Sequence, residues 1–172
     1  METIESLYRQ YRRPVFTYLY GLTHNVHAAE DLTQETFLQV IRSIPTFRGD
    51  SKVTTWIFGI ARNLYRKWAG MNRNGAANLD LMCIDLPDIK LSNLPDRMLE
   101  LKETSLTVHR ILAQLPEHQK ELIILRDWHG MSYDDIARIM GKSLSWVKVN
   151  IYRSRTEFRN KYNRLEDLGN EK

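Results

Sequence analysis

The stretch SYDDIARIMGKSLSWVKVNIYRSR, residues 132–155, determines the fold of the C-terminal part of the chain. Ser132 and Asp135 have the spacing of a capping box, in which a serine and an acid three positions later close the start of a helix. Gly141 tolerates the positive φ of a tight turn, and Ser143 is a suitable N-cap for the next helix. This arrangement predicts a helix-turn-helix.

The second helix of this motif, expected to end near Tyr162, has an apolar side and a basic side. Its apolar side chains form one stripe that should face the core: Leu144, Val147, Ile151, Phe158 and Tyr162. The opposite side suits the major groove of DNA, because long cations reach phosphates while central side chains meet base edges. The residues expected there are Ser145, Trp146, Lys148, Val149, Tyr152, Arg153 and Arg155. A packing contact with another protein is the alternative explanation for the two aromatic rings among them.

Helical periodicity is not confined to this motif. Apolar residues recur at helical spacing over residues 5–72 and 99–164, and strand-like alternation is absent. We expect three or four helices in each stretch, with breaks in the first at residues such as Pro14 and Gly21.

The segment between these two stretches is rich in Asn, Asp and Pro and has no sustained period, which indicates a linker. The predicted fold is therefore all-α, with two small helical domains joined by a flexible linker. The predicted boundaries are 1–72 for the N-terminal domain, 73–104 for the linker and 105–172 for the C-terminal helix-turn-helix domain.

The positive charge of the chain is concentrated in two segments. The 172 residues have a net charge of +4. Residues 48–73 contain six Lys or Arg and one acid, and residues 138–164 contain eight and one. Two separated basic segments predict two contacts with a polyanion, and two solvated helix faces are the plainer alternative.

Several classes of protein are excluded by the composition. The longest aliphatic run, Leu122–Leu125, is far too short to span a bilayer, so we expect no membrane insertion. Acids at Glu2 and Glu5 are untypical of a secretory signal, which predicts a cytoplasmic protein. The single cysteine, Cys83, cannot form an intramolecular disulfide, and no Cys-x-x-Cys pattern indicates zinc. We expect no metal and no cofactor.

The helix expected at about 28–44 has two distinct sides. The side chains expected in the core are Ala29, Thr33, Phe37, Val40, Ile41 and Ile44. The far side combines two leucines, Leu32 and Leu38, with the acids Asp31 and Glu35. Exposed aliphatic side chains beside acids suit docking onto a basic partner surface.

The helix expected at about 53–69 has a basic outer side. Its inner residues are predicted to be Ile57, Ile60, Ala61, Leu64 and Trp68, and its outer residues Thr55, Gly59, Arg62 and Arg66, with Phe58 and Asn63 beside them. Cations bind phosphates and rings stack on unpaired bases, so this side suits single-stranded or melted DNA. Residues 45–52 form either a pocket for such a base or an ordinary turn.

These residues together resemble a known family. The relevant motifs are AEDLTQETF at 29–37, FRGDS at 47–51, TWIFGIARN at 55–63, GMSYDDIA at 130–137 and SWVK at 145–148. In order and spacing they resemble the extracytoplasmic function (ECF) group of bacterial RNA polymerase sigma factors, over nearly the whole chain.

The resemblance implies a function for each surface. Polymerase would be bound by Asp31, Leu32, Gln34, Glu35 and Leu38. The minus-ten element would be bound, and a flipped base captured, by Phe47, Arg48, Asp50, Lys52, Phe58, Arg62, Asn63 and Arg66. The outward side of the last helix would bind the minus-thirty-five element. The implied partners are core RNA polymerase, promoter DNA and an anti-sigma protein, with no small-molecule substrate. The resemblance also places Phe37 at the polymerase, whereas its periodicity places it in the core, which we favour.

Three other functions fit parts of the sequence. An enzyme would need groups such as His24 with His27, or Cys83, but no third metal ligand has suitable spacing, so we expect ordinary surface histidines and no enzyme. A free-standing helix-turn-helix regulator would leave the acidic N-terminal helix unexplained. An adaptor that binds only proteins would leave the two basic segments unexplained.

Overall fold

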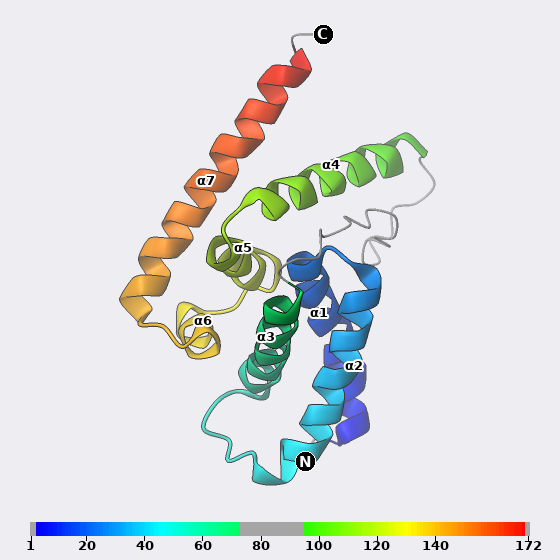
Figure 1. Cartoon of the computed structure of the whole chain (residues 1–172), viewed down its shortest axis with the longest axis vertical. Coiled ribbons are helices and arrows are strands. Elements are labelled where there is room, and N and C mark those ends of the chain that lie inside the picture. The colour runs from blue at the N-terminus through cyan, green and yellow to red at the C-terminus, as the bar shows by residue number, and fades with distance from the viewer. Residues whose placement is uncertain (1–2, 73–94, 171–172) are drawn as a thin grey trace.

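The computed structural model describes residues 3–72 and 95–170, with side chains for 3–72 and 103–169. Among these residues the regular secondary structure is entirely helical, without a strand, which confirms the predicted all-α class (Figure 1). The elements are α1 (Ile4–Thr23), α2 (Val26–Ser43), the 3-10 turn η1 (Ile44–Thr46), α3 (Val53–Met71), α4 (Pro95–Gln114), α5 (Glu117–Ile123), the π-helical turn η2 (Ile124–Trp128), α6 (Tyr133–Met140) and α7 (Leu144–Asn170). Cys83 and most of the predicted linker lie outside the described residues, and the predicted linker end at residue 104 falls within α4.

The N-terminal unit, residues 3–72, consists of α1, α2 and α3, which pack against one another. The predicted break at Pro14 is wrong, because α1 continues through this residue to Thr23. A proline removes one backbone hydrogen bond, whereas the buried face of a long helix is held by its packing. The helix ends at His24, which adopts the left-handed conformation with φ 51°.

The C-terminal unit, residues 95–170, contains the predicted helix-turn-helix. The Ser132 hydroxyl accepts a 3.1 Å hydrogen bond from the Asp135 amide, which confirms Ser132 as the N-cap of α6, and it donates a 2.6 Å hydrogen bond to the Asp135 carboxylate. Gly141 ends α6 with φ 63°. The Ser143 hydroxyl accepts a 3.2 Å hydrogen bond from the Trp146 amide and so caps α7. The helix that follows extends to residue 170, beyond its predicted end.

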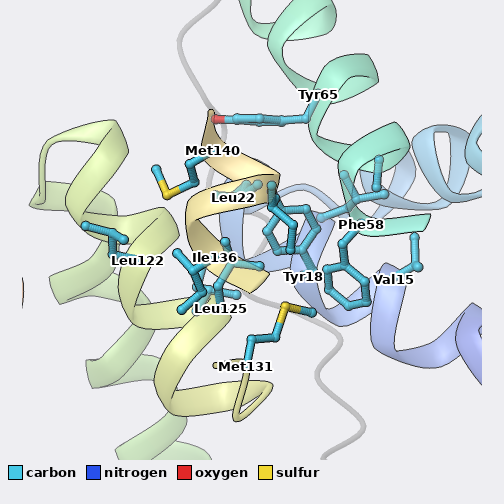
Figure 2. Close-up of a cluster of buried hydrophobic side chains, with 14 of the residues drawn as sticks. Val15, Tyr18, Leu22, Phe58, Tyr65, Leu122, Leu125, Met131, Ile136 and Met140 are labelled. Carbon is cyan, nitrogen blue, oxygen red and sulfur yellow. The ribbon is translucent and has the colours of Figure 1, made fainter. Parts of the chain in front are cut away.

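The two units share one continuous hydrophobic core (Figure 2). We call their contact the junction: α1 and α3 lie on one side of it, and α5, η2 and α6 lie on the other. Tyr18 and Phe58 of the N-terminal unit are fully buried against side chains such as Leu125 and Ile136 of the C-terminal unit. The chain is thus folded back on itself, while the C-terminal end of α7 projects beyond the other helices (Figure 1).

Gly21 explains how closely α1 and η2 approach each other. A Cβ atom at Gly21 would lie 2.8 Å from a methyl of Ile124 and 2.9 Å from the Trp128 ring. A residue with a side chain does not fit there unless these groups move. The predicted helix break at this glycine is therefore wrong, since its function within α1 is to allow close packing.

Candidate nucleic-acid and protein interfaces

The outward side of α7 is open to solvent, as predicted. Val147 and Ile151 are buried against the rest of the C-terminal unit and so fix the rotation of the helix. The residues exposed on the other side are Ser145, Lys148, Val149, Tyr152, Arg153 and Arg155. This surface combines cations, hydroxyls and an aromatic ring on one rigid helix, a suitable shape and charge for a duplex groove.

Two residues at the start of α7 differ from the prediction. Leu144, expected in the core, is exposed, because it occupies the first turn, where no neighbouring element covers it. Trp146, expected to point outward, is only half exposed. Its ring lies 6.0 Å from the His118 ring between centroids, and the Lys142 ammonium lies 5.3 Å from its centroid. Trp146 therefore fixes α7 to α5 in addition to lining the outer surface.

Arg155 is engaged within the C-terminal unit. Its guanidinium donates hydrogen bonds of 3.2 and 2.6 Å to the Asp127 carboxylate. The hydrogen bonds to Asp127 also raise the pKa of Arg155 above its ordinary value. Asp127 thus holds a predicted phosphate-binding side chain in place at the edge of the surface.

The basic helix α3 has one side that remains open. The Phe47 ring stacks on Trp56 with 4.6 Å between centroids and an interplanar angle of 30°. Asn63 and Arg66 are exposed, and the space around Gly59 is open to beyond 4 Å. Trp56, Gly59 and Asn63 lie on one face of α3. Along this face the stacked Phe47–Trp56 rings are followed by the open backbone at Gly59 and then by the Asn63 amide.

The other side of α3 is covered, contrary to the prediction. Thr55 and Phe58 are buried, and the Arg62 side chain is only 12% exposed. The Arg62 guanidinium lies 2.7 Å from the Glu121 carboxylate of α5. The prediction failed because this amphipathic side faces the C-terminal unit, a partner that periodicity within α3 does not reveal.

The loop before α3 is tied to α6 by polar contacts. Asp135 accepts hydrogen bonds from the Lys52 ammonium at 2.8 Å and the Thr55 hydroxyl at 3.0 Å. Partial burial acts to raise the pKa of Asp135, but hydrogen bonds from Lys52, Ser132 and Thr55 together hold it below its usual value. The Asp50 carbonyl accepts a 2.7 Å hydrogen bond from Arg138, while Arg48 is exposed.

The predicted protein-binding side of α2 is open to solvent, except that Leu32 is buried and Ile41 is exposed in its place. Asp31 and Gln34 are exposed, Glu35 is half exposed, and Leu38 is 46% exposed. Leu32, predicted to lie on this surface, is only 7% exposed and packs in the core.

Ile41, predicted in the core, is instead 44% exposed. It lies three residues after Leu38 and therefore on the same side of α2. Phe37 is buried, which confirms the assignment from periodicity. The acidic surface thus has two exposed aliphatic side chains, as expected, but they are Leu38 and Ile41.

Two histidines, His24 and His109, are buried near the junction, and a third, His129, is half-buried there. The prediction of a surface position is wrong for His24, which is covered together with His109, with 5.7 Å between the ring centroids. Burial, the nearby Lys120 and His109 lower the pKa of His24 to about 3, and burial lowers those of His109 and His129 to about 4. Neutral, packed rings are structural groups, and the described part of the chain contains no group of three or more ligands suited to a metal.

Comparisons with known proteins agree with this architecture. The family described as Sigma-70 region 2 matches residues 7–73, and Sigma-70, region 4 matches residues 105–158. The chain is 31% identical to the RNA polymerase sigma factor YlaC of Bacillus subtilis, covering 92% of this chain and 91% of that protein. It is 30% identical to the RNA polymerase sigma-H factor of Pseudomonas aeruginosa, covering 88% and 81%.

Two solved structures have the same fold. The sigma factor RpoE in complex with the anti-sigma factor NepR from Bartonella quintana superposes with a TM-score of 0.71 at 21% identity, covering 92% of this chain and 96% of that one. CnrH in complex with the cytosolic domain of CnrY gives a TM-score of 0.67 at 21% identity, covering 96% and 88%.

Two helical units, one with a helix-turn-helix and one with an acidic and a basic helix, together with these matches, define a sigma factor of bacterial RNA polymerase. Within that class, the chain belongs to the extracytoplasmic function group, since it is 30% identical to the ECF RNA polymerase sigma factor SigX of Bacillus subtilis, covering 88% of this chain and 79% of that protein. It binds core RNA polymerase and directs it to specific promoters for initiation, so a free-standing regulator is not favoured. Sigma factors are transcription initiation factors, not enzymes. No helix within residues 3–72 and 95–170 has the length and apolar character needed to span a membrane.

Proposed function

We propose that this sigma factor has three functional surfaces, each of which binds a different target. The domain at 1–72 binds polymerase through α2 and the minus-ten element through α3 and the loop before it. The domain at 105–172 binds the minus-thirty-five element through α7. The residues between them connect the two across the polymerase surface.

The polymerase surface consists of Asp31, Gln34, Glu35 and Leu38, to which the exposed Ile41 is added. A stripe of acids and aliphatic side chains along one helix suits a basic protein groove, since the aliphatic groups supply buried area and the acids supply charge complementarity. This stripe is the single observation that best supports a sigma factor, because a regulator that binds only DNA has no use for it.

The minus-ten surface is formed by α3 and its preceding loop. The open side, with the Phe47–Trp56 stack and Asn63, is where a base taken out of the duplex would be held by stacking and hydrogen bonding. The cations beside it, Arg48 and Arg66, would hold the strand backbone. Strand opening is driven by binding energy, without ATP.

The minus-thirty-five surface is the outward side of α7. Tyr152 and Arg153 lie near its centre and would contact base edges, whereas Lys148 and Arg155 lie at its margins and would contact phosphates. The same helix would then both position the protein on the duplex and select its sequence.

We further propose a cytoplasmic location and an anti-sigma partner. Transcription requires contact with polymerase and the chromosome. The sigma factor RpoE was co-crystallised with the anti-sigma factor NepR, and CnrH was solved in complex with the cytosolic domain of CnrY. A partner that covers α2 would keep this chain inactive by blocking its contact with polymerase.

The experiment that tests this function combines binding and transcription. The full chain is used to capture bacterial core RNA polymerase, and the complex then transcribes fragmented genomic DNA of the source organism. We expect capture, with defined start sites that share upstream motifs. DNA binding without polymerase capture would overturn the assignment of α2.

A further inference from the structure

The outward side of α7 has an apolar centre between its cations. Val149 is 48% exposed, and Tyr152, almost one turn further along, is 74% exposed. The packing of the helix is supplied by Val147 and Ile151 on the opposite side. Apolar side chains that are scattered singly over a surface need no explanation, but these two are neighbours in the middle of the proposed minus-thirty-five surface. Their chemistry is therefore available to the DNA.

Val149 lies in one row of α7 with Ser145 and Arg153, and all three side chains are exposed. Residues four positions apart lie above one another on a helix, and each step of four advances about 6 Å along its axis. Base pairs are stacked about 3.4 Å apart, so neighbouring members of the row reach base pairs about two steps apart. The row lies in the N-terminal part of α7, which begins at Leu144, and this part of a recognition helix meets the base edges.

The three side chains of this row differ in what they can recognise. The Arg153 guanidinium can pair with the O6 and N7 atoms of guanine, whereas the Ser145 hydroxyl is less selective. Val149 neither donates nor accepts a hydrogen bond. The apolar group that a base pair presents in the major groove is the C5-methyl group of thymine. Opposite a G·C pair, Val149 would leave polar groups of the bases without partners, so it fits an A·T pair best.

The neighbouring amide, which could otherwise recognise adenine, is directed into the helix. Asn150 is 9% exposed, and its side-chain NH₂ group donates a 2.9 Å hydrogen bond to the Trp146 carbonyl. An asparagine that recognises adenine in the major groove needs this amide group for the base. Discrimination at this level of α7 therefore depends on Val149.

We propose that Val149 selects a thymine in the minus-thirty-five element by contact with its C5-methyl group. Arg153 selects a guanine about two base pairs away, and Ser145 lies on the other side of the thymine. The methyl contact buries apolar surface, so its strength does not fall with salt concentration as that of the Lys148 phosphate contact does. This inference rests on the proposed assignment of α7 to the minus-thirty-five element.

Removal of a single methyl group from the DNA tests the proposal. A promoter recovered by run-off transcription of genomic DNA is made as a duplex. Each thymine of its upstream element is replaced in turn by deoxyuridine, which lacks the methyl group and keeps the hydrogen-bonding groups. Binding of each duplex to core polymerase carrying the full chain is measured by competition. We expect one uracil position to weaken binding about threefold to fivefold, the effect of one buried methyl group.

Val149→Ser tests which side chain contacts this methyl group. Serine has nearly the same helix propensity as valine, so the substitution removes the two methyl groups and leaves the helix intact. We expect the Val149→Ser chain to bind the thymine and uracil duplexes equally. Leu168→Ser is the matched control, because it removes an exposed aliphatic side chain from the same helix beyond the minus-thirty-five surface. It should retain the full preference for thymine.

Cytosine and 5-methylcytosine at the same position separate the methyl group from the hydrogen-bonding groups of the base. The unsubstituted chain should bind the 5-methylcytosine duplex about threefold more tightly than the cytosine duplex. The Val149→Ser chain should bind these two duplexes equally.

Two results would overturn the methyl contact: no uracil-sensitive position in the element, or a preference for thymine that is undiminished in the Val149→Ser chain. Failure of the proposed function would be seen differently. If α7 did not bind the upstream element, replacing the whole element by an unrelated sequence would leave binding unchanged. If only the methyl contact were wrong, that replacement would still weaken binding.

Discussion

Arg62 of α3 and Glu121 of α5 form an ion pair of 2.7 Å across the junction, and both side chains are almost completely removed from solvent. Tyr18 completes the arrangement by donating its hydroxyl to the same carboxylate. Burial and the neighbouring Glu121 together raise the pKa of Tyr18 well above that of a free tyrosine, so its hydroxyl remains a donor. One carboxylate of α5 thus joins two helices of the other unit.

Removing either partner of this pair is expected to destabilise the chain strongly. Arg62→Ala leaves a buried carboxylate and Glu121→Ala a buried guanidinium, and each should lower the free energy of unfolding by about 3 kcal/mol. The double variant should lower the free energy of unfolding by clearly less than the sum of the two single-variant losses. Urea unfolding of the chains in a double-mutant cycle measures this difference. The half-exposed Asp127–Arg155 pair is the control, with an expected coupling of under about 1 kcal/mol. Additive effects at the buried pair would contradict this prediction.

Gly21→Ala is expected to disturb the junction. The added methyl would meet Ile124 and Trp128 at less than 3 Å, and we expect a loss of about 1–3 kcal/mol in the free energy of unfolding. Gly70→Ala in α3 is the matched control, since open space surrounds Gly70 and alanine favours the helix by up to about 1 kcal/mol. Equal effects of the two substitutions would mean that the close approach at Gly21 has no energetic importance.

The buried histidines predict a loss of stability in mild acid. The folded chain holds the pKa of His24 at about 3 and those of His109 and His129 at about 4, compared with 6.5 for a free histidine. The unfolded chain therefore takes up protons first as the pH falls below 6.5. The free energy of unfolding should decrease by about 1 kcal/mol per pH unit for each histidine between pH 6.5 and about 4, and these groups should have no effect above that window.

Chemical denaturation at a series of pH values measures this dependence. His109→Gln should reduce the slope below pH 6.5, because one titrating group is removed. His27→Gln is the control, because His27 is exposed, and it should leave the slope unchanged. A slope in the unsubstituted chain that does not change below pH 6.5 would count against neutral buried histidines.

Arg153 and Lys148 are expected to differ in their effect on promoter binding. Arg153→Ala should weaken binding to the preferred upstream element by about 1–3 kcal/mol and relax the sequence preference at one position. Lys148→Ala should weaken binding to all sequences alike and reduce the salt dependence. Competition binding of the polymerase complex to base-substituted duplexes measures both. A uniform loss from Arg153→Ala would identify it as a phosphate contact.

Charge reversal on α2 should abolish polymerase binding. Asp31→Lys with Glu35→Lys places cations where we propose that a basic surface docks, and we expect loss of capture of core polymerase with unchanged helical content. Glu166→Lys with Asp167→Lys, at the far end of α7, makes the same change in charge and should retain binding. Capture by the first variant at normal affinity would remove α2 from the polymerase interface.

The helix-turn-helix was predictable in detail because its determinants are local. Ser132, Gly141 and Ser143 act on backbone groups within a few residues, and the structure has each of them in the expected conformation. The buried stripe of α7 was partly predictable for the same reason, with Val147 and Ile151 fixed by periodicity.

The junction was not predictable, because it depends on contacts between distant segments. Phe58 and Arg62 have the pattern of an outer helix surface, and only the position of α5 and α6 shows that they are covered. The exposures of Leu32 and Ile41 were predicted the wrong way round for a related reason. Whether an aliphatic residue at the margin of a helical stripe is buried depends on the neighbouring helix and not on its spacing.

The junction joins two parts of one polypeptide, and this has a consequence for gene dosage. Glu121 faces Arg62 at an effective concentration that is set by the connecting chain and not by the number of molecules present. A contact between two separate chains weakens on dilution, whereas a contact within one chain accompanies every copy. The fraction of free molecules in which the junction is formed is therefore the same at low and at high expression.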